Sequence, residues 1–352
     1  MFPREETVDT PDMKIKIGIV GFGFMGQMHA WVYQALPGVE IAGIADPSKE
    51  GLKKAEQMGL KVPIFPSLKE LLQKGDCNVI DICLPTDLHV DAIIAAARAG
   101  KHIFCEKPLA LDIPKAERAL ALVEKSGVTF QVGQCIRFWP EYQALEEFVK
   151  SGRGGRLVSL SLQRRSSRPS YSRENWLLNS ARSKGAALDL HIHDTDFVLH
   201  LLGKPSAVHS IGRKEGKAWS RIFTHYLFKD VAVTAEGAWD LPPEWGFQMT
   251  FQAVFESAVI DFDTKSFPTL HVTLGKRKRV PLPFNKPDLK SKTATGGNIS
   301  DLGGYCNELA YFCECLRDGV KPKIATGRQA LESLRTVLAE IRSASLRKKI
   351  AL

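Results

Sequence analysis

The chain has 352 residues, a formal net charge of +9 and 25% charged residues, a composition typical of a folded globular protein. At roughly 100–200 residues per domain, this length favours two domains. No run of 18 apolar residues occurs, and residues 1–13 lack the apolar segment of a secretory signal. We therefore expect a soluble, cytoplasmic protein without membrane contact, in which residues 1–13 form a flexible tail.

The first part of the chain alternates short apolar runs with helical patterns. Strands are expected at residues 14–20, 39–45, 78–84, 102–105 and 129–132. Helices are expected between them, at residues 27–36, 49–58, 90–99 and 113–126. Strands separated by helices of this length indicate βαβ units with a parallel sheet. We therefore predict a doubly wound α/β Rossmann domain over residues 14–137.

After residue 138 the pattern changes to strands that follow one another directly. They are expected at residues 157–163, 207–211, 223–228, 231–239, 248–255, 258–263 and 271–274, with one helical pattern at 188–202. This arrangement predicts an α+β domain over residues 138–326, with a large, open-faced and mostly antiparallel sheet. Helices follow at 305–318 and 327–345, and we expect residues 327–352 to pack back on the Rossmann domain. Residues 291–300 are the expected mobile loop.

Two features of composition limit the partners of the protein. The seven cysteines form no C-x-x-C pair, which indicates reduced, mostly buried thiols without a metal. The basic residues are spread along the chain without a nucleic-acid-reading motif, so no nucleic-acid partner is expected. Strands 223–228 and 248–255 carry more large apolar residues than one covered sheet face requires. We therefore expect a homodimer or homotetramer through the open face.

A glycine-rich segment follows the first predicted strand and opens the first predicted helix. Its G-x-G-x-x-G pattern consists of Gly21, Phe22, Gly23, Phe24, Met25 and Gly26. In such a motif the first glycine permits a tight turn, the second lets the backbone approach a pyrophosphate, and the third allows close helix–strand packing. The helix N-terminus offers unpaired N–H groups to the phosphates. The segment therefore predicts a dinucleotide site.

The acidic residue Asp46 ends the next predicted strand, 20 residues after Gly26. Its carboxylate can accept hydrogen bonds from the adenosine ribose and would repel a 2′-phosphate. We therefore expect NAD as the cofactor, with NADP disfavoured. The alternative is that Asp46 only caps the turn before Pro47.

Three further segments complete a recognisable pattern: Leu84-Pro85-Thr86-Asp87-Leu88-His89, Glu106-Lys107-Pro108 and Asp189-Leu190-His191-Ile192-His193-Asp194. Together with the glycine segment they closely resemble the glucose-fructose oxidoreductase/inositol dehydrogenase (Gfo/Idh/MocA) family, over nearly the whole chain from Lys14. The resemblance implies oxidation of sugars, polyols or glycosides, or reduction of the matching ketones. It implies catalytic roles for Lys107, Asp189 and His193. It also implies positions near the cofactor for Leu84, Pro85, Thr86, His89, Glu106, Lys107, Gln134 and Arg137.

The chemistry of the three catalytic candidates suits this reaction. Asp189 and His193 are four residues apart, so on one helix they would share a face. A histidine with an ordinary pKa near 6.5 can take the hydroxyl proton, and a lysine ammonium after a parallel strand can stabilise the alkoxide. Asp189 would hold a neighbouring hydroxyl or orient the histidine. Because i, i+2 and i+4 side chains on a helix do not converge, we expect no metal at 189–193.

The segment 164–184 is rich in arginine and lies just before Asp189. It either lines the substrate entrance, where it would favour an acidic sugar, or forms a solvated loop, which is the more common case. Candidate substrate contacts are Arg164, Arg168, Trp176 and His191, although His191 is expected mainly to pack or support the site.

Three functions remain in competition. The first is an NAD-dependent dehydrogenase of sugars, polyols or glycosides. The second is glycoside cleavage in which NAD is reduced and then reoxidised within each turnover. The third is an NAD-binding sensor without catalysis, against which the intact Lys107, Asp189 and His193 argue.

Overall fold

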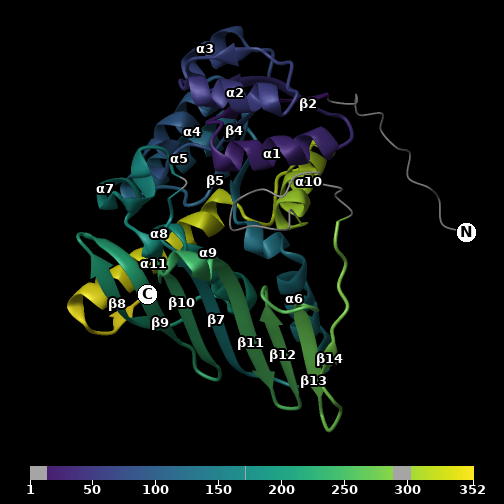
Figure 1. The fold of residues 1–352 in the computed structure, drawn as a ribbon, viewed down its shortest axis with the longest axis vertical. Helices are drawn as coiled ribbons and strands as arrows, with labels where there is room; N and C mark the ends of the chain where they lie inside the picture. The colour runs from purple at the N-terminus through teal and green to yellow at the C-terminus, as the bar shows by residue number, and fades with distance from the viewer. Residues whose placement is uncertain (1–13, 171, 288–302) are drawn as a thin grey trace, which may run out of the picture.

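The computed structural model describes residues 14–170, 172–287 and 303–352 (Figure 1). The predictions made for residues 1–13 and 291–300 lie outside these ranges. Figure 1 shows a first domain, at the top, placed above the end of a large sheet that forms the second domain. Among the described residues, no helix has both the length and the apolar character needed to cross a bilayer.

The first domain contains a parallel sheet in the order β3-β2-β1-β4-β5-β6. Its strands are β1 (Ile15–Val20), β2 (Val39–Ala45), β3 (Ile64–Phe65), β4 (Val79–Ile82), β5 (His102–Glu106) and β6 (Phe130–Gly133). The strand order reverses between β1 and β4, and ligands of such sheets bind beyond the carboxyl ends of the strands at this point. The predicted Rossmann topology is confirmed.

Helices cover both faces of this sheet, as a doubly wound fold requires. They are α1 (Phe24–Ala35), α2 (Lys49–Gln57), α3 (Leu68–Lys74), α4 (His89–Arg98) and α5 (Ile113–Ser126), with a 3₁₀ turn η1 (Thr86–Leu88). Helix α1 packs beside α10 (Gly303–Arg317), whereas α5 packs beside α4 and α11 (Gly327–Leu346). The sequence reading missed β3 and α3, because two- and seven-residue elements are too short to display a period.

The second domain is built on a nine-stranded sheet in the order β14-β13-β12-β11-β7-β10-β9-β8-β15. The strands are β7 (Leu157–Ser167), β8 (Ala207–Glu215), β9 (Ala218–Leu227), β10 (Ala232–Leu241), β11 (Phe247–Phe255), β12 (Ala258–Asp263), β13 (Leu270–Leu274), β14 (Val280–Pro281) and β15 (Ile350–Ala351). Strands β7 and β10 pair in parallel and the other neighbours are antiparallel, which confirms the mostly antiparallel sheet.

One face of this sheet carries the helices of the second domain. They are α6 (Pro140–Ser151), α7 (Ser180–Ser183), α8 (Ala186–Asp189) and α9 (Ile192–Leu202), with 3₁₀ turns η2 (Cys135–Phe138), η3 (Arg173–Leu178) and η4 (Pro243–Trp245). The ring of Tyr142 on α6 lies 4.8 Å from Phe197 and 5.0 Å from Phe251, which joins two helices to the sheet. Helix α6 was not predicted; Pro140 occupies its first turn, where proline is favoured.

The opposite face of the sheet has no helix cover in Figure 1. Ile211 and Phe223 are cross-strand partners there and remain 59% and 41% exposed. Oligomerisation through this face stays a prediction. Helix α11 lies against α5 and β6 of the first domain and against β8 of the second.

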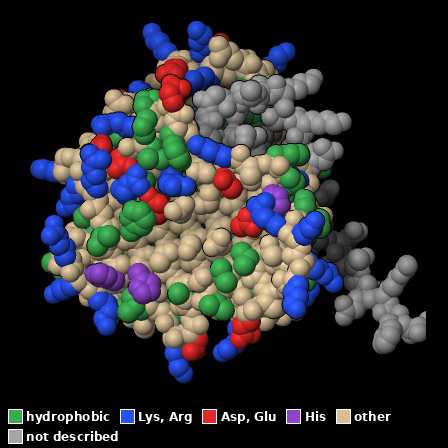
Figure 2. Space-filling view, turned by 60° about the horizontal axis from the view of Figure 1, so that its bottom comes forward, with side chains coloured by type: hydrophobic (Ala, Val, Ile, Leu, Met, Phe, Trp, Pro, Cys, Tyr) green, Lys and Arg blue, Asp and Glu red, His purple; other side chains and the backbone are tan. Residues whose placement is uncertain are grey.

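In Figure 2, Lys and Arg side chains are scattered around the outline of the face in view, with acidic side chains between them. All seven cysteines are free thiols, and all except Cys83 are buried.

Candidate active site

A cavity of about 830 Å³ lies between the two domains. Its first wall consists of the glycine segment, the turn after β2 and the ends of β4 and β5. Its second wall consists of η3, α8, α9 and residues of β7, β10 and β11. The carboxyl ends of the Rossmann strands therefore face the helices that carry Asp189 and His193.

The glycine segment has the geometry that a dinucleotide phosphate requires. Gly21 has φ +88°, a left-handed conformation that favours glycine. A Cβ on Gly26 would lie 2.1 Å from the carbonyl oxygen of Gly21, so this glycine allows α1 to pack against the turn. Gly23 lines the cavity, and a Cβ there would meet no atom within 4 Å. The N-terminus of α1 has no side-chain cap, and its first residues, Phe24 and Met25, line the cavity.

Asp46 lies on the same wall, just after β2. One carboxylate oxygen accepts a hydrogen bond from the backbone N–H of Phe22 at 2.7 Å. The other accepts from the backbone N–H and the hydroxyl of Ser48, at 2.7 Å and 2.5 Å. These bonds hold the carboxylate between the glycine segment and α2, where an adenosine ribose would be recognised. The residues present therefore fit NAD.

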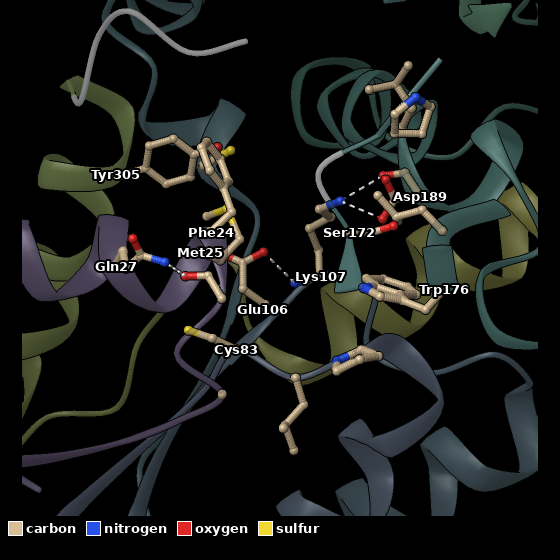
Figure 3. A pocket seen from close by; sticks show the side chains of 18 of the residues that line it. Phe24, Met25, Gln27, Cys83, Glu106, Lys107, Ser172, Trp176, Asp189 and Tyr305 are labelled. Carbon is tan, nitrogen blue, oxygen red and sulfur yellow. Dashed lines mark hydrogen bonds and ion pairs between the residues drawn. The ribbon is translucent and has the colours of Figure 1, made fainter. Parts of the chain in front are cut away.

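Lys107 projects from the end of β5 across the cavity to the second domain (Figure 3). Its Nζ donates to the backbone carbonyl of Asp189 at 2.8 Å and to the Asp189 carboxylate at 3.1 Å. Both side chains are 13% exposed. An ammonium fixed at this depth can stabilise negative charge on a substrate oxygen.

His193 lies in the same cavity and is 8% exposed. Burial, followed by the positive charges of Lys107 and Arg164, holds the pKa of His193 well below its ordinary value. The imidazole is therefore neutral at neutral pH, as a proton acceptor must be. Its Nδ1 lies 3.9 Å from the sulfur of Cys135.

Asp189 and His193 do not lie on one helix, so the expectation that their four-residue spacing places them on one helical face is corrected. Asp189 is the last residue of α8, and His193 is the second residue of α9. Leu190 and His191 between them keep right-handed helical angles, so both side chains still reach the cavity. The carboxylate of Asp189 contacts Lys107 across the domain junction.

The structure divides the other candidate residues into two sets. Those that line the cavity are Gly21, Phe22, Gly23, Phe24, Met25, Asp46, Leu84, Pro85, Glu106, Arg164 and Trp176. Those that do not are Gly26, Thr86, His89, Gln134, Arg137, Arg168 and His191. The residues of the second set lie outside the lining of the cavity.

His89 and Arg137 illustrate this supporting position. The ring nitrogens of His89 lie 2.8 Å from the carbonyl oxygens of Leu84 and Pro108, so the ring joins the loops after β4 and β5. Arg137 donates two hydrogen bonds to Asp196 at 2.7 and 2.8 Å, in the buried junction between η2 and α9. Thr86 and Gln134 are also buried outside the cavity.

Two of the four proposed substrate contacts lie elsewhere. His191 is fully buried and its Nε2 lies 2.9 Å from the Glu340 carboxylate, on the side of α11. Arg168 is 60% exposed and pairs with Glu215 at 2.9 Å. Neither lines the cavity, so we do not retain them as substrate contacts. His191 faces inward because its neighbours at 189 and 193 face the cavity, as a helical turn requires.

Several cavity residues were not identified from the sequence. They include Gln27, Cys83, Cys135, Trp139, Trp239, Phe247 and Tyr305. Each stands outside the recognised motifs, and an isolated tryptophan or cysteine carries no local signal of its environment. Arg182, within the basic segment, donates to Asp87 of the first domain at 2.8 Å.

Comparison with known proteins supports this organisation. A family profile described as an oxidoreductase family with an NAD-binding Rossmann fold matches residues 15–134. The profile of the GFO/IDH/MocA C-terminal domain matches residues 142–259. The first domain is therefore an NAD-binding Rossmann domain.

The individual proteins that resemble this chain have low sequence identity to it. The scyllo-inositol 2-dehydrogenase (NAD⁺) of Bacillus subtilis is 26% identical over 344 residues, which cover 94% of each chain. The 2,7-anhydro-N-acetylneuraminate hydratase of Escherichia coli is 31% identical over 199 residues, 56% of this chain and 52% of that protein. Other relatives align over only 54–56% of their own length, so the chain spans about half of them.

Among solved structures, levoglucosan dehydrogenase in complex with NADH and levoglucosan superposes with a TM-score of 0.82. The superposition covers 96% of this chain and 99% of that one, at 21% identity. This likeness establishes the fold of both domains.

Proposed function

We propose, from the premise that this chain belongs to the GFO/IDH/MocA oxidoreductase family, that it oxidises a carbinol carbon of a sugar, polyol or glycoside with NAD as hydride acceptor. One observation carries the proposal. Lys107 and Asp189 are in contact, and both line the same cavity as His193 and the glycine segment. A proton acceptor, a fixed cation and a dinucleotide cradle thus share one enclosed space.

The division of labour follows from the charges. NAD⁺, when bound, accepts the hydride that leaves the carbinol carbon with the electron pair of the C–H bond. Neutral His193 takes the hydroxyl proton, and the C=O double bond forms as the O–H and C–H bonds break. Lys107 donates a hydrogen bond to the oxygen as negative charge develops on it. Asp189 holds the Lys107 ammonium in place, which makes it a positioning residue.

The charges of the cavity wall point to an uncharged substrate. Each Lys or Arg on the described wall lies within 4 Å of a carboxylate oxygen. The pairs are Lys54–Glu50, Lys107–Asp189, Arg164–Asp194, Arg173–Glu174, Arg182–Asp87 and Lys286–Glu141. Arg164 and Asp194 are both buried, so an acidic substrate would have to compete with a desolvated ion pair. The residues of the basic segment that line the described wall, Arg164, Arg173 and Arg182, thus supply no unmatched cation for a uronate or a phosphate.

The aromatic lining agrees with a sugar ring. Trp139, Trp176 and Trp239 line the cavity together with Phe247 and Tyr305. Aromatic faces bury the apolar C–H face of a pyranose or cyclitol, while paired acids and bases remain available to its hydroxyl groups. We therefore infer an uncharged polyhydroxylated ring as the substrate class.

A panel of matched substrate pairs tests this function. Glucose with glucuronate, and galactose with galacturonate, differ only in an uncharged or a charged group at one end of the ring. Cyclitols, linear polyols and alkyl glycosides complete the panel, and NADH formation is followed by absorbance. We expect at least about tenfold higher kcat/KM for the uncharged member of a productive pair, since a charge placed in a dry, paired wall is costly.

Two results would redirect the proposal. Higher kcat/KM for the uronates would contradict the assignment of an uncharged substrate. Glycoside cleavage without accumulated NADH would favour the redox-recycling alternative, which the hydratase relative makes worth testing. The Lys107→Ala variant is the control, because NADH formation that this substitution leaves undiminished would not arise at the proposed site.

A further inference from the structure

A cluster of buried ionisable side chains lies directly behind the first wall of the cavity, which carries the glycine segment and is called the cofactor wall from here on. It consists of His29 on α1, Asp81 on β4, Glu106 at the end of β5 and Glu308 on α10. His29, Asp81 and Glu308 are fully buried, and Glu106 is 5% exposed. Burying four such groups is costly unless their charges compensate one another, so their arrangement calls for an explanation.

His29 connects the cluster. Its Nδ1 lies 2.8 Å from Asp81 Oδ2, and its Nε2 lies 3.2 Å from Glu106 Oε1. Burial opposes a charge on the imidazole, but the attraction and hydrogen bonds of Asp81 and Cys83 together outweigh it, and the pKa of His29 is raised well above its ordinary value. His29 is therefore an imidazolium between two carboxylates.

Glu308 plays a different part. Neither of its carboxyl oxygens has a hydrogen-bond partner among the described residues. One of these oxygens, a ring nitrogen of His29 and a carboxylate oxygen of Glu106 all lie within 4.8 Å of one another. Burial, followed by repulsion from Glu106, raises the pKa of Glu308 well above its ordinary range. Glu308 is thus a neutral carboxylic acid. One imidazolium and the two carboxylates of Asp81 and Glu106 leave the cluster with a net charge of −1.

Glu106 is the member of the cluster that lines the cavity. It lines the wall beside Lys107, and its Oε2 accepts a hydrogen bond from the Lys107 backbone N–H at 3.2 Å. Figure 3 shows its carboxylate on the cavity side, between Met25 and Lys107. The positive charge of Lys107 itself is matched by Asp189 across the cavity. The negative charge of the cluster is therefore not cancelled by its catalytic neighbour.

We propose that Glu106, with the buried cluster behind it, favours the positively charged oxidised nicotinamide over the neutral reduced form and so sets the redox balance of the bound cofactor. The inference rests on the proposed function, because it requires NAD in this cavity. A fixed negative charge in a poorly solvated wall attracts a nearby cation strongly and leaves a neutral ring unaffected.

Equilibrium binding of the two cofactor forms tests this without turnover. NADH is titrated by fluorescence and NAD⁺ by calorimetry, for the unmodified protein and for Glu106→Gln. We expect the ratio of Kd for NAD⁺ to Kd for NADH to rise about tenfold in Glu106→Gln, the effect of removing one nearby charge.

Two matched variants serve as controls. Glu50→Gln removes a carboxylate from the exposed part of the same cavity wall, close to Asp46. Glu308→Gln replaces a neutral acid by a neutral amide of the same shape. Both variants should leave the ratio within about twofold of the unmodified protein, since neither removes a charge close to the ring.

A second measurement does not depend on a stable Glu106 variant. The unmodified protein is titrated with benzamide adenine dinucleotide, an analogue of NAD⁺ of the same shape whose benzamide ring carries no positive charge. The proposal expects NAD⁺ to bind about tenfold more tightly than this analogue. Equal affinities would overturn it.

The remaining outcomes are also decisive. An unchanged ratio in Glu106→Gln, with both forms bound, would overturn this inference alone. A shift in Glu308→Gln as large as that in Glu106→Gln would contradict the neutral state of Glu308. Stoichiometric divalent metal in the purified protein would also overturn the inference, because it would neutralise the cluster. Failure of both NAD⁺ and NADH to bind would overturn the proposed function as well.

Discussion

The two walls of the cavity are built by different means. The cofactor wall depends on the backbone of one contiguous segment, residues 21–27, with Asp46 held against it by the N–H of Phe22. The second wall, called the substrate wall here, depends on pairs of side chains that come together from distant parts of the chain. Lys107 reaches Asp189, Arg164 reaches Asp194, and Arg182 reaches Asp87.

The difference teaches where each wall is sensitive to substitution. Backbone angles and N–H groups are insensitive to the identity of Phe22 or Phe24, because their contribution does not pass through the side chain. A paired charge is different, since removing one member leaves the other unmatched in a poorly solvated place. Single substitutions should therefore affect the substrate wall more severely than the cofactor wall.

The largest expected effect is on catalysis. His193→Ala should lower kcat by about 10²–10⁴, the usual contribution of a positioned base, while NADH affinity is retained because His193 belongs to the second domain. Lys107→Ala should lower kcat by a similar or larger factor, and Lys107→Arg should restore it only in part. Steady-state kinetics and fluorescence titration measure both quantities. Near-normal kcat in His193→Ala would remove histidine from the role of base.

The pH dependence sharpens the same assignment. Burial and the nearby cations lower the pKa of His193, so the imidazole stays neutral, and active, at pH values below 6.5. We expect kcat to remain level as the pH falls through 6.5 and to decline only below it. The residual activity of His193→Ala should lack this acidic decline. A decline centred at 6.5 or above in the unmodified protein would contradict the buried position of the base.

Arg164→Ala should have the next largest effect, on stability. Arg164 donates to Asp194 at 3.0 and 3.1 Å, and both side chains are buried. Removing one partner of a buried pair typically costs about 3–5 kcal/mol, which chemical denaturation would detect as a lower free energy of unfolding. The matched double variant Arg164→Leu with Asp194→Leu should lose less than Arg164→Ala, because no charge is left unmatched. Equal losses would mean that packing, and not charge, dominates.

Asp46, like Glu106, is a point at which the cofactor wall depends on a side chain. Its carboxylate should make NADH bind more tightly than NADPH by roughly tenfold or more, through repulsion of the 2′-phosphate. Asp46→Ser should shrink this preference and leave kcat with saturating NAD⁺ much less affected than His193→Ala does. Titration with both reduced cofactors measures the ratio. Tighter binding of NADPH by the unmodified protein would refute the assignment.

Assembly concerns a third surface, the open face of the second sheet. The exposed pair Ile211 and Phe223 lies on the open face of the second sheet, and neither residue lines the cavity. We predict a homodimer or homotetramer through this face, visible by light scattering at micromolar concentration. Ile211→Asp with Phe223→Lys should shift the mass towards the monomer. A strict monomer for the unmodified protein would contradict the prediction.

The smallest effect is expected at Arg168. It belongs to the same basic segment as Arg164 but lies in solvent, paired with Glu215 outside the cavity. Exposed ion pairs contribute little, so Arg168→Ala should change kcat/KM by less than about twofold. Comparing Arg168→Ala with Arg164→Ala separates the effect of burial from that of charge, because Arg164 lies in β7 and Arg168 directly follows it. A large loss of activity in Arg168→Ala would return this residue to the substrate site.

Much of the fold was predictable because its signals are local. The alternation of strand and helix identified the Rossmann topology, and the chain of successive strands identified the second sheet. Helix α6 was not predicted although Pro140 at its start is a favourable signal, and β3 and α3 were missed because they are short. The parallel pairing of β7 with β10 was not predictable, since it depends on which strands meet after folding.

The sequence by itself determined the glycine cradle, Asp46 at a strand end, and the three catalytic candidates. The glycine cradle and Asp46 follow from residue types at fixed spacing after predicted strands, whereas the catalytic candidates are what the resemblance to the family implied. Only the tertiary structure decided that Lys107 contacts Asp189, that Arg164 pairs with Asp194, and that His191 faces α11. Only the tertiary structure gathered His29, Asp81, Glu106 and Glu308 behind the cofactor wall. Ionisation depends on burial and on charges within a few ångströms, and neither is written in the local sequence.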